Sequence, residues 1–174
     1  MTQVAVGGYL RLNDEGLVGT LQMGAGVGAS TFGFDLFAIS GTFQMEVNLT
    51  NNIQTIQTLD ISEYGVISGF KEGTIDPWTA RVIFCGNLTL FELLLIQGRM
   101  EMTISETGLE IDMDMILDLS LMGEINIEGA AGILFTDNGP VFAMSVDASV
   151  NLGIPQVGIF ADASVQINTG QEAY

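Results

Sequence analysis

Residues 97–118, QGRMEMTISETGLEIDMDMILD, decide the fold class, because apolar and polar residues alternate on both sides of Thr107-Gly108. A period of two residues is typical of a β-strand with one buried face, whereas an α-helix repeats about every 3.6 residues. If Thr107-Gly108 forms a two-residue turn, the residues brought opposite each other are all apolar. These pairs are Ile104 with Ile111, Met102 with Met113, and Met100 with Met115. The segment therefore predicts an antiparallel β-hairpin.

Three other glycine-containing steps pass the same test, at Glu15-Gly16, Gln97-Gly98 and Asn138-Gly139. Asn-Gly is the preferred pair for a two-residue hairpin turn. The pairs that these turns oppose are Leu10 with Leu21, Leu95 with Met100, Leu93 with Met102, Phe91 with Ile104, Phe135 with Phe142, and Ile133 with Met144. Residues 37–49 alternate as well, which predicts a long half-buried strand.

These patterns predict an all-β chain whose antiparallel hairpins form either a sandwich or an elongated curled sheet. In residues 51–78, Thr, Gln, Gly and the Asp76-Pro77 step interrupt the alternation, so we expect short strands and a loop there. No linker-like stretch divides the chain, and we predict one β domain over residues 1–174. The strand around Leu94 and Ile96 is apolar on both sides. We expect residues 51–78, a second sheet or a neighbouring copy to cover it.

The two ends of the chain resemble each other: residues 8–50 and residues 132–170 both give a hairpin followed by a long alternating strand. Asn48 of the first segment matches Asn168 of the second, at an offset of 168 − 48 = 120 residues. An internal repeat would suggest a tandem array. The alternative is that any two alternating strands with glycine turns look alike.

The stretch GTFQMEVNLTNN (41–52), with its sequel QTIQT (54–58), resembles the repeats of very large bacterial cell-surface and adhesin-like proteins. The resemblance covers mainly residues 37–60 and, more loosely, residues 86–170, and it carries no catalytic signature. It implies a structural or adhesive module at the cell surface or outside the cell. The chain departs from such proteins in lacking a calcium-binding nonapeptide of the GGxGxD kind.

The charge balance excludes one class of partner. The chain has 21 Asp and Glu, 4 Lys and Arg and no His, which gives a net charge of −17 at pH 7. Such a chain is repelled by the phosphates of nucleic acids and by anionic lipid head groups. The longest apolar stretch, residues 88–96, contains Glu92 and is about half as long as the ~20 residues that a membrane helix needs. We therefore expect no nucleic acid partner and no transmembrane helix.

One group of residues could bind a metal ion. In the Thr107-Gly108 register, five carboxylates share one face of two strands, and calcium prefers several oxygen ligands close together. They are Glu101, Glu110, Asp112, Asp114 and Asp118. The alternative is a charged face that is simply solvated. No other cofactor is expected.

Nothing in the sequence predicts an enzyme. A Cys-His nucleophile is impossible without histidine, and neither a GxSxG elbow nor a P-loop occurs. Cys85 follows a run of apolar residues and is expected to be a small buried side chain.

The function predicted from these features is a structural or adhesive repeat module, or a fibre subunit, of an extracellular bacterial surface assembly. Its edge strands would join it end to end with other copies or with neighbouring repeats. The alternative is a β-sheet carrier that holds lipid or another apolar ligand in a hydrophobic groove, since nine methionines could line a pliable apolar surface.

Overall fold

The computed structural model describes residues 3–31, 34–61, 67–90, 94–119, 122–136, 139–154 and 157–169, and almost all of them lie in β-strands. The strands are β1 (Gln3–Asn13), β2 (Gly16–Thr31), β3 (Phe34–Leu49), β4 (Gln54–Ile61), β5 (Ile67–Ile75), β6 (Thr79–Leu90), β7 (Leu94–Ser105), β8 (Gly108–Asp118), β9 (Gly123–Thr136), β10 (Gly139–Ile154) and β11 (Val157–Asn168). The predicted all-β class is confirmed.

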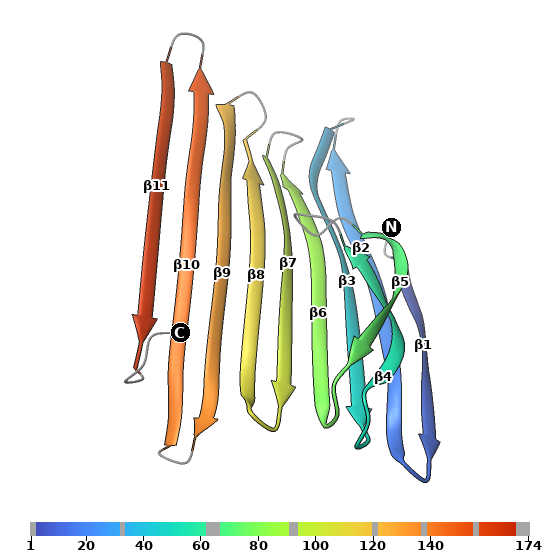
Figure 1. The fold of residues 1–174 in the computed structure, drawn as a ribbon. Helices are drawn as coiled ribbons and strands as arrows, with labels where there is room; N and C mark the ends of the chain where they lie inside the picture. The colour runs from blue at the N-terminus through green and yellow to red at the C-terminus, as the bar shows by residue number, and fades with distance from the viewer. Residues whose placement is uncertain are drawn as a thin grey trace.

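Nine strands form one open antiparallel sheet in the order β1-β2-β3-β6-β7-β8-β9-β10-β11. Of the two predicted architectures, the molecule has the single open sheet rather than a sandwich of two large sheets, with β1 and β11 as its edges (Figure 1). The remaining strands, β4 and β5, form a hairpin that lies over one face of the sheet near β2 and β3 (Figure 1). This hairpin accounts for the short strands expected in residues 51–78.

The two segments that resemble each other in sequence lie at opposite ends of the sheet. The described residues of the segment 8–50 belong to the β1-β2-β3 end, and those of the segment 132–170 belong to the β9-β10-β11 end. Each end is a meander of three sequential antiparallel strands. The β4-β5 hairpin follows the first meander along the chain, so the two ends differ in what covers them.

Three of the four predicted hairpins exist, but each pairs two residues away from the predicted register. Ile111 lies opposite Met102 rather than Ile104, so Glu106 and Thr107 form the turn. Likewise Leu10 lies opposite Gly19 instead of Leu21, and Phe142 lies opposite Ile133 instead of Phe135. A slip of two residues keeps every side chain on its face, so matching apolar residues cannot distinguish these registers. Asn138 itself is outside the described residues.

Two of the three glycines that the sequence places in these turns, Gly16 and Gly108, lie instead at the start of a strand, close to the backbone of a third strand. A Cβ on Gly108 would lie 2.1 Å from the carbonyl oxygen of Ile133 on β9. A Cβ on Gly16 would lie 2.1 Å from the carbonyl oxygen of Leu49 on β3, and Gly16 also has a φ of +131°. Both glycines therefore sit at the first position of a strand because a neighbouring backbone approaches closely.

The predicted hairpin at Gln97-Gly98 is wrong, because β7 continues through both residues. Gln97 lies opposite Asn87 on β6 and Ile116 on β8. Alternation is therefore unbroken along β7, and Ile96 lies on the same face as Met100. The strand that looked apolar on both sides is apolar on one side only, apart from Leu95. Phe91 and Leu93, which this hairpin would have paired, lie outside the described residues.

Two small apolar clusters pack the β4-β5 hairpin onto the sheet. Ile56 and Ile75 of the hairpin contact Val18 of β2, and all three are buried. A second cluster joins Leu59 to two buried residues of β6, with two half-buried hairpin residues around it. The members of this second cluster are Leu59, Ile83, Cys85, Ile61 and Ile67. The buried apolar core of the described residues is thus small and, apart from Ile116 of β8, lies under the hairpin.

Candidate functional site

Strand pairing divides the nine-stranded sheet into two faces of opposite character. Directly paired residues point to the same side of a sheet, and successive residues point to opposite sides. One continuous row of paired residues therefore runs across all nine strands on one face: Gly8, Leu21, Met45, Val82, Met102, Ile111, Ala131, Met144 and Ile167. We call this side the apolar face and the opposite side the polar face.

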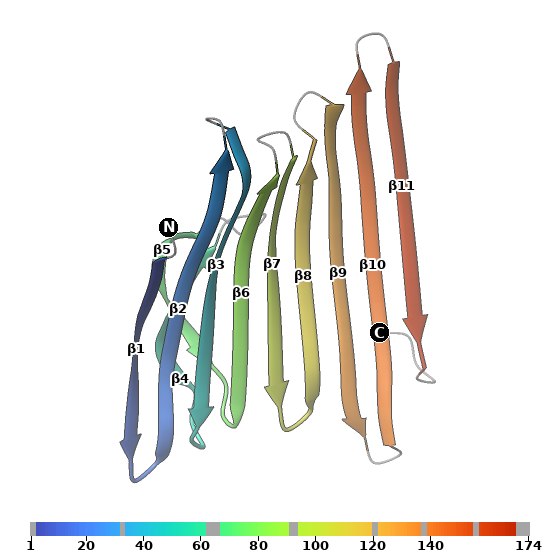
Figure 2. The same cartoon turned by 180° about the vertical axis from the view of Figure 1, so that it is seen from behind.

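The apolar face carries no charged or polar residue at any position whose side chain the structure describes. Large side chains on this face are exposed: Val6, Leu10, Leu12, Met23, Leu49, Phe84, Met100, Ile104, Phe135, Ile159, Val165 and Ile167. Figure 2 shows this side of the sheet, with the β4-β5 hairpin behind it and no described strand across it. Exposed patches of this extent mark interaction surfaces.

The polar face is covered over β2, β3 and β6 by the hairpin, and its centre there is a buried ion pair. Glu46 of β3 is 0% exposed. Its Oε2 accepts a hydrogen bond from Nε of Arg81 at 2.6 Å, and its Oε1 accepts one from the Gln44 side chain at 2.6 Å. Gln44 also donates to the carbonyl oxygen of Gln57 on β4 at 3.2 Å. A buried charge needs such partners, and here they also tie the hairpin to the sheet.

Asn48 makes the second connection between the sheet and the hairpin region. Its Nδ2 lies 2.9–3.0 Å from the carbonyl oxygens of Asn52, Ile75 and Asp76. Its Oδ1 accepts hydrogen bonds from the backbone and the hydroxyl of Thr50. One buried amide therefore satisfies backbone groups at both ends of the segment that contains β4 and β5.

The sequence pattern did not predict this role for Gln44, Glu46 and Asn48. The alternation along β3 separates them from Phe43, Met45 and Val47, but it does not say which side is covered. One signal was present: among the polar residues of residues 40–48, only Glu46 is charged. A strand face whose polar residues are mostly uncharged is more typical of a surface that another segment covers than of a solvated surface.

The five predicted metal ligands all lie on the polar face, but in a different register from the one expected. Glu101 lies opposite Asp112, and Asp114 lies opposite Arg99. Glu110 and Asp118 lie opposite Thr103 and Leu95, one towards each end of the β7-β8 pair.

Two of these carboxylates have basic neighbours. Asp114 Oδ2 lies 3.8 Å from Nε of Arg99, and Glu101 Oε1 lies 3.7 Å from Nη1 of Arg81. Among the residues that the structure describes, no three His, Cys, Asp or Glu side chains lie close enough to hold a metal ion. The predicted calcium ligands thus share a face but do not form a compact ligand set.

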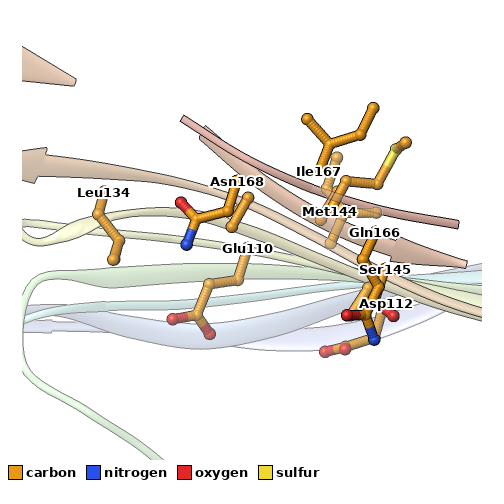
Figure 3. A pocket seen from close by; sticks show the side chains of 13 residues that line it. Glu110, Asp112, Leu134, Met144, Ser145, Gln166, Ile167 and Asn168 are labelled. Atoms are coloured by element: carbon orange, nitrogen blue, oxygen red, sulfur yellow. The ribbon is translucent and has the colours of Figure 1, made fainter. Parts of the chain in front are cut away.

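A hollow of about 500 Å³ lies on the uncovered half of the polar face, over β8 to β11. Its floor is low because Ala130, Gly132 and Ala143 are small. Polar groups surround this floor, with Glu110 and Asp112 from β8, Ser145 from β10, and Gln166 and Asn168 from β11. Figure 3 shows the carboxylates of Glu110 and Asp112 on one side of the sheet, and Met144 and Ile167 pointing to the other.

Cys85 is buried, as predicted, and belongs to the second cluster beneath the hairpin. Burial raises the pKa of its thiol to about 11, so it is neutral at ordinary pH. A neutral, enclosed thiol is a poor nucleophile.

No family model, curated protein or solved structure matches this chain. Within the described residues, the structure contains no helix that is long and apolar enough to cross a membrane.

Proposed function

We propose that the chain is a structural subunit or repeat module of an extracellular bacterial surface assembly, joined to its neighbours through edge strands. The observation that carries this proposal is the character of β1 and β11, the two edges of the open sheet. β1 has Arg11 as its one charged residue, and β11 has Asp162; neither strand contains Lys or Pro. Charges, Lys and Pro are the usual means of blocking edge pairing.

The direction of the edge strands determines how copies can join. Nine antiparallel strands place β1 and β11 in the same direction, because the first and last of an odd number of alternating strands are equivalent. A junction between β11 of one copy and β1 of the next is therefore parallel and heterologous. A heterologous contact that does not close extends as a filament. Salt should favour it by screening the charge of −17 on each copy.

The substitution Ser164→Pro tests this junction. Thr169 donates its N–H to the carbonyl oxygen of Phe142 on β10. N–H groups alternate sides along an antiparallel strand, so the N–H of Ser164 points to the free edge. Proline removes this donor without removing a bond to β10. Light scattering and electron microscopy at high salt should show long assemblies for the unmodified chain and short ones for Ser164→Pro.

The control is Ser164→Thr, which keeps the N–H and should assemble like the unmodified chain. An unmodified chain that stays monomeric at high concentration and high salt would contradict the filament proposal.

The second candidate is a carrier of lipid or another apolar ligand, and the apolar face favours it. Mass spectrometry of an organic extract of the protein, purified without detergent, tests this function. Stoichiometric lipid would support it, and an extract without apolar molecules would contradict it.

A further inference from the structure

The apolar face requires a cover, because exposing so many large side chains to water is unfavourable. We propose that this cover is a second copy of the chain, packed face to face so that two sheets form a sandwich. The contact uses a different surface from the edge junction and does not depend on it.

The size of the face fits a stable homodimer. Nine strands at a spacing of about 4.8 Å give a width of about 40 Å. The eleven residues of a strand such as β8, at about 3.4 Å each, give a length of about 37 Å. Two such faces would bury about 3,000 Å² in total, which lies within the range of about 2,000–5,000 Å² for obligate homodimers.

The surface of the face suits another sheet. Gly41, Gly86 and Gly98 lie side by side on β3, β6 and β7. The ring of Phe84 lies over the first two, since a Cβ on Gly41 or Gly86 would come within 3.2 Å and 2.9 Å of its ring atoms. A ring lying along the backbone keeps the centre of the face low. Two such apolar faces can then approach to the ~10 Å spacing of packed sheets.

Methionine gives this face adaptability. Seven of the nine methionines lie on it: Met23, Met45, Met100, Met102, Met113, Met115 and Met144. Met1 lies outside the described residues, and Met122 is exposed beside the start of β9. Unbranched thioether side chains can adjust to fill the gaps between two identical surfaces.

The distribution of charge favours a second copy over a lipid surface. Arg11, Arg81 and Arg99 all lie on the polar face, and Lys71 lies on the hairpin that covers it. The apolar face thus presents no basic side chain to lipid phosphates among the described residues, and a chain with a charge of −17 is repelled by anionic head groups. In a face-to-face dimer the two polar faces point outward. Two sheet layers of about 10 Å spacing then separate their charges, which is more than the ~8 Å Debye length.

The substitution Met100→Lys tests the dimer, because Met100 lies near the middle of the apolar face and is 39% exposed. Analytical ultracentrifugation in detergent-free buffer at physiological ionic strength, where the Debye length is about 8 Å, should give a dimer for the unmodified chain. The dissociation constant of the dimer should be at least tenfold higher for the Met100→Lys variant. The matched control is Asp112→Lys, on the polar face of the neighbouring strand, which should remain dimeric.

Photo-methionine cross-linking of the unmodified sequence avoids the possibility that Met100→Lys fails to fold. Intermolecular cross-links should join the methionines of the apolar face. Three results would overturn the proposal: a monomeric mass, a monomer carrying stoichiometric lipid, or a dimer without cross-links on this face. A dimer that persists in Met100→Lys but is lost in Ser164→Pro would assign the contact to the edges instead.

Discussion

The polar face of the sheet has two halves that share one alternation pattern but differ in what lies over them. Under the β4-β5 hairpin, Glu46 and Asn48 are 0% exposed and make short hydrogen bonds to their neighbours. Over β8 to β11, where no described segment covers the face, Glu110 and Asp112 are exposed to solvent. The same kinds of side chain therefore hold two layers together in one half and carry solvated charge in the other.

The largest expected difference between the halves is the effect of removing an arginine. Arg81→Ala leaves Glu46 as a buried charge without its guanidinium partner. Breaking a buried ion pair in this way costs about 3–5 kcal/mol. Chemical denaturation should therefore show a midpoint far below that of the unmodified chain.

The control for this prediction is Arg99→Ala on β7, at the margin of the hairpin, where the arginine lies beside a partly exposed carboxylate. Arg99 is half-buried, and its Nε lies 3.8 Å from Asp114. Such partly exposed pairs contribute about 0–1 kcal/mol. Equal losses for the two variants would show that the hairpin does not create a distinct environment.

The next effect concerns the two asparagines that match between the ends of the chain. Asn48→Ala removes the amide that serves the carbonyl oxygens of Ile75 and Asp76. Leaving such buried groups unsatisfied should cost about 2–3 kcal/mol. The equivalent change, Asn168→Ala, alters an exposed side chain and should cost less than Asn48→Ala, because exposed groups that lose a partner can hydrogen-bond to water instead.

Thermal unfolding of both variants checks this prediction. Equal losses at the two positions would contradict the link between burial under the hairpin and the cost of removing the amide.

The sequence predicts the strands well because alternation is a local property. Met100, Met102 and Ile104 share a face whatever their partners are, so the class of fold follows from the residues themselves. Register depends on the turn, and residues two apart are equivalent in the apolar test. Gly108 illustrates this. A side chain at this position would collide with the carbonyl oxygen of Ile133, which lies on a strand that begins 15 residues later along the chain (123 − 108 = 15).

The candidate site could be predicted only in part. The acidic residues were correctly placed together on one face, because Glu110, Asp112 and Asp114 follow each other at every second position. The cover over Glu46 could not be predicted, because β4 and β5 have few alternating apolar residues. Tertiary packing decides which face of β3 the β4-β5 hairpin contacts. The alternation pattern alone does not distinguish the buried amides of Gln44 and Asn48 from amides that face solvent.

The pH dependence of stability should also separate the covered half from the uncovered one. Burial under the hairpin raises the folded-state pKa of Cys85 from 9.0 to about 11. A raised pKa means that the folded state favours the neutral thiol. The contribution of the Cys85 thiol to the free energy of unfolding is therefore complete below pH 9 and is lost as the pH rises towards 11.

The size of this effect should be about 1 kcal/mol at pH 10. Unfolding by denaturant at pH 8 and pH 10, compared between the unmodified chain and Cys85→Ala, isolates the thiol from the other groups that titrate. A difference between the two chains that stays constant with pH would mean that the thiol is accessible to water in the folded state.

The smallest effect concerns two of the predicted calcium ligands, on the neighbouring strands β7 and β8. Glu101 and Asp112 lie directly opposite each other, and like charges in that arrangement repel. Asp112→Asn should therefore stabilise the chain by about 0.2–0.5 kcal/mol.

Because no three carboxylates lie close enough together among the described residues, calcium and magnesium at equal ionic strength should raise the unfolding temperature equally, by general screening. A chelator should leave it unchanged. A rise specific to calcium that disappears in Asp112→Asn would instead support the site that the sequence predicts, because a ligand that binds only the folded state stabilises it in proportion to its occupancy.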